Sequence, residues 1–98
     1  GKLMPLYVLA CFDKADALDL RMATREAHLA WAADQKHRIR RAGPMLSETD
    51  TMAGSLFFLE AESADEVRAF SATDPYSKAG LFDRIEVQRF RASLGEPL

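Results

Sequence analysis

The chain has 98 residues, 48% of them hydrophobic and 29% charged, and a formal net charge of −2 at pH 7. This length and composition predict one globular domain, and the small negative charge excludes the broad positive field of a typical nucleic-acid-binding protein. The sequence also lacks any run of about 18 apolar residues, so we expect no membrane span.

Cys11 is the only cysteine. A single thiol excludes an intramolecular disulfide and fits a reducing compartment, so we expect a cytoplasmic protein. We expect no charged and then apolar leader before the domain. Residues 1–3 come before Met4, and we expect them to be a cloning remnant, with the domain over residues 4–92 and a C-terminal tail over residues 93–98.

The first predicted strand covers residues 6–12, a continuous apolar run that is typical of a strand covered on both faces and central in its sheet. A long helix is predicted from residue 17 to about residue 41, where strong helix formers dominate and Pro and Gly are absent. We expect Asp16 to cap this helix and Asp19 to stabilise its first turn, and we allow for a break near Thr24.

The predicted helix ends at Gly43-Pro44, because glycine accepts the left-handed cap conformation and proline cannot continue a helix. Basic residues at 36–41 decorate its predicted C-terminus, where cations complement the helix dipole. A contact with nucleic acid or a protein partner is the alternative interpretation of this basic segment. The predicted core face comprises Leu18, Met22, Leu29, Ala32 or Ala33, and Ile39.

A hairpin is predicted next. Residues 44–48 predict a short strand near a sheet edge, since Pro44 cannot donate a hydrogen bond to a ladder. Residues 55–61 predict the second strongly apolar strand. The turn between them, at residues 49–54, makes the pair antiparallel.

Ser63 and Glu66 form a capping box that predicts a second, short helix. Val67 and Phe70 are spaced to face the core. The helix should end before Pro75, because the residue that precedes a proline avoids the helical region.

The C-terminal part is predicted as a turn at residues 73–76, a loop or single helical turn at residues 77–81 closed by Gly80, and a last strand at residues 83–91. That strand alternates along its length. Its inward residues are Ile85 and Val87, and its outward residues are Arg84, Glu86 and Gln88.

The resulting β-α-β-β-α-β order predicts a ferredoxin-like α+β fold, in which a four-stranded antiparallel sheet carries two helices on one face. The strands are too apolar for the second face of the sheet to remain exposed to water, since Phe57 and Phe58 point to opposite faces. We therefore expect a homodimer packed sheet to sheet, which forms a dimeric α/β barrel.

His28 is the histidine that is embedded among apolar residues, whereas His37 lies in the basic segment and is expected to be exposed. Arg25 precedes His28 by three residues, so both lie on one helix face. Arg25 is either a solvated arginine or a group that binds an anion bidentately. A helix histidine satisfied by a backbone carbonyl is the structural alternative for His28.

Asp74 follows the second helix, and Pro75 fixes the direction of its chain. Both helices cover the same face of the sheet, so we expect Asp74 to meet His28. A carboxylate fixes the tautomer of an imidazole and raises its basicity, which makes it a general base or acid near neutral pH. An Asx-type turn is a second role for Asp74, and the two roles are compatible.

These motifs together resemble the YciI-like (YCII-related) family. The residues that carry the resemblance are Arg25-x-x-His28-Leu29-x-Trp31, Gly43-Pro44, Asp74-Pro75-Tyr76 and Ala79-Gly80-Leu81. The match spans nearly all of residues 4–92 in the right order. It implies a ferredoxin-like fold, a homodimer with an α/β-barrel interface, and an active site built around His28 and Asp74.

The resemblance also implies a reaction class. A described enzymatic relative in the family is a chlorohydroxyhydroquinone dehydrochlorinase, which eliminates HCl from an aromatic diol with the His/Asp pair. This chain has Trp31 where a tyrosine-type aromatic is commoner, so its pocket is expected to differ in shape.

We expect Arg25, Ser47 and Trp31 to contact substrate, with Ser47 as a hydroxyl donor and Trp31 as a wall of the pocket or a core residue. No Cys/His/Asp cluster has zinc spacing and no glycine-rich phosphate loop is present. We therefore expect no metal and no cofactor. Cys11 is expected to be a buried, unreactive residue.

The sequence thus predicts a small, cofactor-independent lyase (dehydrochlorinase-like) or isomerase. His28, held by Asp74, would move a proton on a small aromatic or enolisable acid, and Arg25 would hold the negative charge that develops. The alternative is a non-catalytic module that binds a small anion or dimerises. We expect an anionic or phenolic ligand and neither nucleic acid nor a membrane as partner.

Overall fold

The computed structural model describes residues 4–98, and the expectation for residues 1–3 lies outside this part of the chain. The predicted β-α-β-β-α-β order is confirmed, with α3 as an added single turn. The elements are β1 (Leu6–Asp13), α1 (Leu18–Asp34), β2 (Ile39–Leu46), β3 (Met52–Glu60), α2 (Ala64–Thr73), α3 (Pro75–Lys78) and β4 (Phe82–Arg89).

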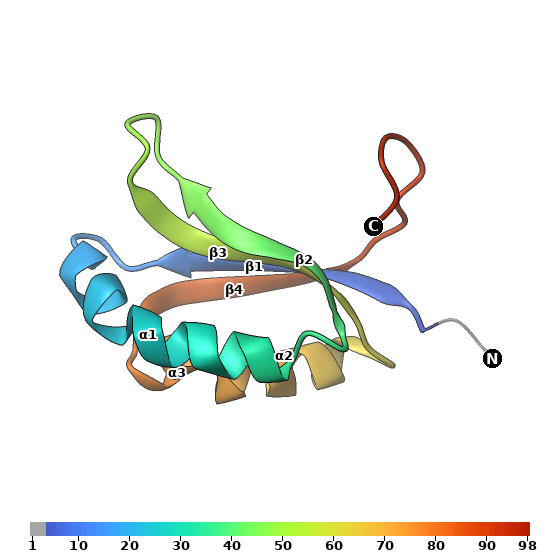
Figure 1. The fold of residues 1–98 in the computed structure, drawn as a ribbon, viewed down its shortest axis with the longest axis horizontal. Coiled ribbons are helices and arrows are strands. Elements are labelled where there is room, and N and C mark those ends of the chain that lie inside the picture. The colour runs from blue at the N-terminus through green and yellow to red at the C-terminus, as the bar shows by residue number, and fades with distance from the viewer. Residues whose placement is uncertain (1–3) are drawn as a thin grey trace.

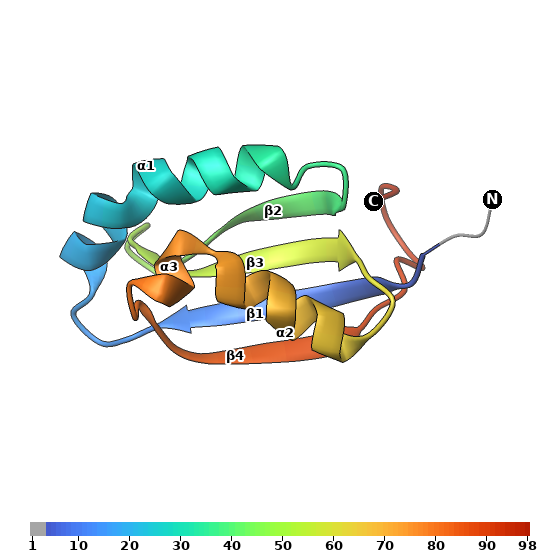
Figure 2. The same ribbon diagram turned by 90° about the horizontal axis from the view of Figure 1, so that it is seen from below.

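The four strands form one antiparallel sheet in the order β2-β3-β1-β4. All helices lie on one face of this sheet, with α1 along the β2 side and α2 across β1 and β4 (Figures 1 and 2). β1 is central, as its continuous apolar run predicts. β2 is an edge strand, as Pro44 predicts, but it begins at Ile39 and is longer than the predicted strand at residues 44–48.

The core lies between the sheet and α2. Alternate residues of β1 and β3 point into it, and Val67 and Phe70 pack on them from α2 as predicted. Its buried members are Tyr7, Leu9, Cys11, Phe57, Leu59, Ala61, Val67 and Phe70. Burial of each large apolar side chain contributes about 1.5–3 kcal/mol, so this cluster holds the sheet and α2 together.

The C-terminal end of α1 corrects the predicted helix. α1 stops at Asp34, and the basic residues 36–41 form a turn and the start of β2 rather than a helix end. Ile39 packs against the core, and residues 39–46 pair with β3. This tertiary pairing outweighs the helix propensity of the segment, so Gly43-Pro44 lies inside a strand.

Two of the cations in this basic segment are engaged by acidic side chains. Arg38 pairs with Glu66 and contacts the Phe70 ring, and Arg40 pairs with Glu60. This pairing removes part of the positive charge that a nucleic-acid contact would need.

The start of α1 also differs from the prediction. Ala17 is the N-cap and makes no side-chain capping bond, while Asp16 adopts a left-handed conformation with φ of 54°. Asp19 lies in the first turn as predicted. Thr24 lies within an unbroken helix, where its hydroxyl donates to the Leu20 carbonyl at 2.8 Å.

The predicted core face of α1 is wrong for Leu18, Met22 and Leu29, whereas Ile39 packs against the core as predicted, but from β2. Leu18, Met22 and Leu29 are 41%, 52% and 47% exposed, and the buried residue of this helix is Arg21, which is 2% exposed. The inward side of α1 carries polar as well as apolar residues because this part of the helix stands over a cavity rather than directly on an apolar core.

The second helical region follows its sequence signals. Ser63 accepts a hydrogen bond from the backbone N–H of Glu66 at 3.1 Å, which completes half of the capping box. The Glu66 carboxylate accepts from the N–H of Glu62 rather than from that of Ser63. Asp74 caps α3, and Gly80 closes that turn with φ of 76°.

On the face of the sheet away from the helices, the two central strands β1 and β3 carry apolar side chains. Val8 lies opposite Phe58, and Ala10 lies opposite Leu56. The β2–β3 turn and the C-terminal tail rise from the sheet on this side and flank the apolar face (Figure 1). β4 keeps the predicted alternation, with Ile85 packed on the core and Arg84 exposed.

Within residues 4–98, no helix is long and apolar enough to cross a membrane.

The buried thiol of Cys11 makes the stability of the fold depend on alkaline pH. Burial raises the pKa of this thiol to about 12. The folded state binds the thiol proton more tightly than the unfolded chain does, so the protonated thiol adds to the free energy of unfolding. This contribution is complete below the unfolded pKa of about 9 and is lost as the pH rises towards 12. Urea unfolding of wild type should lose up to about 1.4 kcal/mol more per pH unit across this window than Cys11→Ala.

A thiol reagent at pH 8 supplies the control for this prediction. It should label Cys11 only after unfolding, since the thiolate is scarce and buried in the native protein. Equal alkaline slopes for wild type and Cys11→Ala would contradict the assignment.

Candidate functional site

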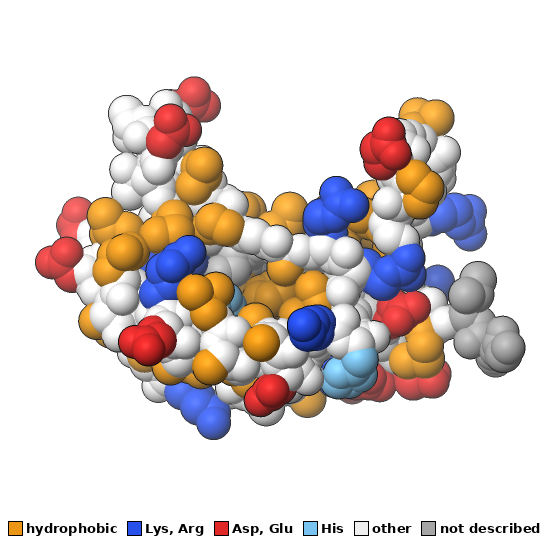
Figure 3. Space-filling model, in the orientation of Figure 1, with side chains coloured by type: hydrophobic (Ala, Val, Ile, Leu, Met, Phe, Trp, Pro, Cys, Tyr) orange, Lys and Arg blue, Asp and Glu red, His pale blue; other side chains and the backbone are white. Residues whose placement is uncertain are grey.

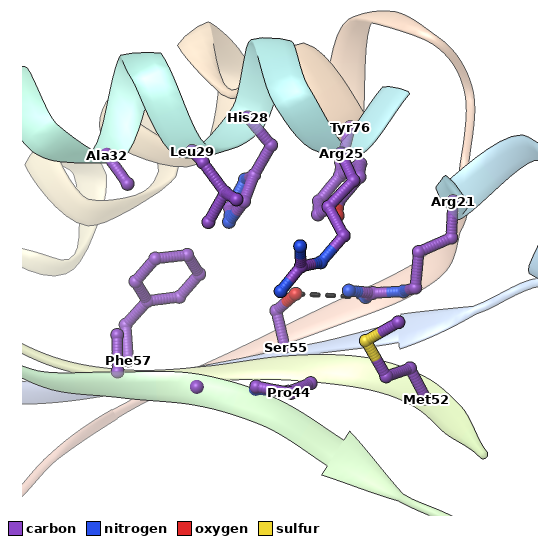
Figure 4. Close-up of a pocket in the computed structure, with 12 residues that line it drawn as sticks. Arg21, Arg25, His28, Leu29, Ala32, Pro44, Met52, Ser55, Phe57 and Tyr76 are labelled. Carbon is purple, nitrogen blue, oxygen red and sulfur yellow. Dashed lines mark hydrogen bonds between the residues drawn. The ribbon is translucent and has the colours of Figure 1, made fainter. Parts of the chain in front are cut away.

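A cavity opens between α1 and the edge strand β2, where Figure 3 shows a hollow with hydrophobic side chains inside. It encloses about 170 Å³, which is smaller than the roughly 300–1,000 Å³ of pockets for drug-sized ligands. Its apolar walls come from both layers of the fold: Leu29 and Ala32 of α1 face Pro44, Met52 and Phe57 of the sheet (Figure 4).

The polar groups of the cavity come mainly from α1. Arg21, Arg25 and His28 project from this helix, at positions four and three residues apart that share one face (Figure 4). Ser55 of β3 and Tyr76 of α3 complete the polar lining.

The structure brings His28 and Asp74 together. His28 Nδ1 lies 2.8 Å from Asp74 Oδ1, and the Asp74 side chain is 1% exposed. An ionised carboxylate only accepts hydrogen bonds, so in this pair the Nδ1–H of His28 is the donor and Asp74 Oδ1 is the acceptor. The other ring nitrogen, Nε2, is then the one left to act on a ligand in the cavity.

Asp74 also has a structural role. It forms the single-residue link between α2 and α3, and its Oδ1 accepts the backbone N–H of Tyr76 at 2.9 Å. Both roles predicted for this residue, an Asx-type cap and a partner of His28, therefore occur at one oxygen. The cap fixes the carboxylate before any ligand binds.

Aromatic rings hold the imidazole of His28 from several sides. The Tyr76 ring stacks on it with centroids 4.1 Å apart and an interplanar angle of 16°. Phe57 approaches it edge-on at 6.3 Å, and Trp31 lies at 5.7 Å. Rotation of the imidazole would lose both this packing and the hydrogen bond to Asp74.

Trp31 does not line the cavity. Its Nε1–H donates to the Thr73 hydroxyl at 2.9 Å, and its ring packs on Phe70 with centroids 4.8 Å apart. Trp31 therefore ties α1 to α2 behind His28. The structure gives it a position that supports the site and no contact with the cavity.

Arg21 is the most deeply buried cation of the site. Its Nε and Nη2 donate to the two carboxylate oxygens of Asp13 at 2.7 and 2.9 Å, and Nη2 also donates to Ser55 Oγ at 2.9 Å. Its guanidinium carbon lies 4.5 Å from the centroid of the Tyr76 ring. The bidentate pair with Asp13 permits a permanent cation beneath α1.

These contacts shift the pKa values of two groups. Burial lowers the pKa of Arg21, but the hydrogen bond and charge of Asp13 outweigh this effect, so the net shift is upward. Burial raises the pKa of Tyr76 despite the opposing charges of Arg21 and Arg25. Arg21 thus stays charged, and the Tyr76 phenol stays neutral at physiological pH.

Arg25 lines the cavity but is exposed. No ion pair at this residue is found within residues 4–98, so its charge is available to a ligand.

The structure does not bring Ser47 to the cavity. It lies in the β2–β3 turn, where its hydroxyl accepts the N–H of Thr51 at 3.1 Å. β2 ends at Leu46, before the predicted end at residue 48, so Ser47 belongs to the turn and lies beyond the part of β2 that lines the cavity.

Three polar groups of the cavity, Arg21, Ser55 and Tyr76, were not predicted. Arg21 lies seven residues before His28 and four before Arg25, a spacing that puts all three on one helix face. Ser55 is a polar residue that shares the inward face of an otherwise apolar strand with Phe57. These signals were present in the sequence but do not by themselves distinguish a cavity from solvent.

Among the described residues, no group of three or more His, Cys, Asp or Glu side chains is arranged to hold a metal ion.

The chain is similar to known proteins in sequence and in fold. The YCII-related domain family matches residues 5–91. Protein YciI of Escherichia coli O6:H1 is 36% identical and covers 88% of this chain and 96% of its own length, and Protein YciI of Shigella flexneri has the same values. An uncharacterised Haemophilus influenzae protein is 29% identical over 87% of this chain.

A solved structure with a similar fold is that of the 5-chloro-2-hydroxyhydroquinone dehydrochlorinase TftG from Burkholderia phenoliruptrix AC1100. It superposes with a TM-score of 0.80 and 36% identity, and it covers 88% of this chain and 93% of the dehydrochlorinase chain. That enzyme was solved in complex with 2,5-dihydroxybenzoquinone.

The Arg21–Asp13 pair leads to a stability prediction. Arg21→Met leaves the Asp13 carboxylate, which is 6% exposed, buried without its partner. Loss of one partner of a buried pair costs about 3–5 kcal/mol. Urea denaturation should show this loss in Arg21→Met and recovery of most of it in the double variant Arg21→Met/Asp13→Leu. Equal free energies of unfolding for the single and the double variant would show that the Arg21–Asp13 pair contributes little to stability.

Proposed function

This chain belongs to the YciI-like family of YCII-related domains, and we propose that it is a small enzyme that moves a proton with His28 and Asp74 and needs no cofactor. The observation that carries the proposal is the 2.8 Å hydrogen bond between His28 Nδ1 and a buried Asp74 carboxylate, beside a cavity. An imidazole held in this way keeps Nε2 free to accept or return a proton near neutral pH.

The proposed substrate is a small phenolic or enolisable acid. His28 Nε2 takes a proton from a substrate O–H or acidic C–H, and the electron pair left behind gives the substrate a negative charge. Arg25 lies at the cavity without an ion pair among the described residues, so it is available to stabilise that charge. The neighbouring Asp74 carboxylate stabilises the imidazolium that forms.

The proposed reaction class is elimination or isomerisation. In an elimination, the substrate gives its proton to His28 and expels a leaving group such as chloride with the bonding electron pair. In an isomerisation, His28 returns the proton to another atom of the same substrate. The dehydrochlorinase relative, at 36% identity, supports elimination.

Asp74→Asn is the direct test of the dyad. The asparagine side-chain oxygen can still accept the Tyr76 N–H, so the α3 cap should survive, but the negative charge next to His28 is lost. Halide release from 5-chloro-2-hydroxyhydroquinone should fall by about 10²–10⁴-fold. His28→Ala should lose at least as much.

Circular dichroism and thermal unfolding control for the fold in both variants. Near-normal turnover by a folded Asp74→Asn protein would count against the dyad.

A non-catalytic small-anion-binding module is the second candidate. The two arginines at the cavity favour it, because they would attract an anion with or without chemistry. A thermal-shift screen of phenols, catechols, lactones and keto acids against wild type and His28→Ala identifies ligands, since ligand at about 100 times its dissociation constant adds about 2.7 kcal/mol to stability. Recovery of such a ligand unaltered after long incubation would favour binding over catalysis.

We also propose that the protein is a homodimer that packs through the apolar face of the sheet, in a cytoplasmic setting that suits its single thiol. The supporting observation is the row of apolar side chains on the face away from the helices, including Val8, Ala10, Leu56 and Phe58. These four side chains are half-buried in the single chain, and an apolar patch that remains accessible to solvent is typical of an interface.

Phe58→Glu should convert the dimer to a monomer in light scattering, because it places a charge in the middle of that face. Ala69→Glu on α2 adds the same charge to the helical side and should leave the mass unchanged. A wild-type protein of monomer mass at micromolar concentration would contradict the proposed dimer.

A further inference from the structure

The polar end of the cavity is organised by Arg21 and Ser55 rather than by His28. In Figure 4, Ser55 and Arg21 lie at one end with Arg25 above them, while His28 and Phe57 lie towards the other. Arg21 is 2% exposed and Ser55 is 4% exposed. Both nevertheless line the cavity, so their polar atoms meet whatever it holds.

The contact with Arg21 determines whether the Ser55 hydroxyl acts as a hydrogen-bond donor or acceptor towards a ligand. Ser55 Oγ accepts a hydrogen bond from Arg21 Nη2 at 2.9 Å, and a guanidinium can only donate. The hydroxyl proton of Ser55 is therefore not used in this contact. No described residue accepts that proton, so Ser55 is left as a donor at the cavity.

Arg21 brings a fixed positive charge to the cavity as well. Its Nε and Nη2 make the bonds to Asp13 and Ser55, and a side-chain contact with Tyr76 also favours the charged form of its guanidinium. Arg21 lines the cavity, so its charge acts on a ligand held there.

Asp13 makes this arrangement rigid. Its two oxygens hold the guanidinium at 2.7 and 2.9 Å and offset the cost of burying the charge. Donors that are fixed before the ligand arrives and shielded from water stabilise negative charge more strongly than mobile surface donors do. Arg25 differs, because it is exposed and has no such anchor.

We propose that Ser55 and Arg21 form a preorganised oxyanion subsite, which selects ligands with an ionised oxygen on a flat, unsaturated carbon: a phenolate, an enolate or a carboxylate. This inference rests on the proposed function and adds a specificity determinant to it. The ligand's apolar part lies against Leu29 and Phe57, near His28, and its charged oxygen lies against Ser55 and Arg21.

Binding of three matched probes tests the subsite: 4-nitrophenol, 4-nitrobenzoate and 4-nitroanisole, the last of which cannot ionise. Calorimetric titration above the pH of phenol ionisation should show that Ser55→Ala weakens binding of the phenolate or the carboxylate by roughly tenfold or more, because a hydrogen bond to a charged group is lost. Binding of 4-nitroanisole should change by less than about twofold. Ser47→Ala, a serine away from the cavity, is the matched control.

The colour of 4-nitrophenolate gives a second readout. A site that prefers the anion lowers the pKa of the bound phenol below that of the free phenol, and Ser55→Ala should raise it again. A merely structural role for Ser55 would not move this value. Arg21→Lys, which keeps the charge and loses the fork to Asp13, should act in the same direction if it folds.

The outcomes separate the subsite from the proposed enzyme. Preference for 4-nitrobenzoate over the phenolate would assign the subsite to carboxylates. Equal weakening of all three probes by Ser55→Ala, or no binding of either anion by wild type, would overturn the subsite. Halide release in wild type and its loss in Asp74→Asn would stand or fall independently of these results.

Discussion

The buried guanidinium of Arg21 is the constraint on which the site depends. A helix on a sheet ordinarily presents an apolar stripe to the core, but α1 also turns the polar side chains of Arg21 and His28 inward. Each of these groups must be satisfied by a partner from another element, and Asp13, Ser55 and Asp74 supply the contacts. The space between α1 and β2 therefore remains a polar-lined cavity, while the packed core gathers under α2.

Asp74 has both a structural role, as the cap of α3, and a role in the site, as the partner of His28. The short link between α2 and α3 needs a cap, and the carboxylate that supplies it also holds His28. Tyr76, the next residue but one, has its N–H bound by that cap and its ring stacked on the imidazole. This one turn thus determines the tautomer and the orientation of the His28 imidazole, which is the group proposed to move a proton. The imidazole is therefore already ordered before a ligand binds.

Local signals predicted most of the elements. The capping box at Ser63 and the position of Pro75 bound α2 correctly, and the apolar run at residues 6–12 is a central strand. The family resemblance pointed to His28 and Asp74, which lie in contact. Predictions failed where tertiary pairing competes with propensity: residues 39–41 join β2 because β3 supplies their partners, although their composition suits a helix.

The sequence by itself determined the β-α-β-β-α-β order, the apolar character of both sheet faces and the family, because strand alternation, caps and turns are encoded by near neighbours. Only the tertiary structure decided which face of α1 turns inward and which polar residues meet. Arg21 bonds to Asp13 eight residues away and to Ser55 thirty-four residues away. A polar residue that is satisfied by such distant partners has the same local pattern as one that faces water, so spacing along the chain cannot tell them apart.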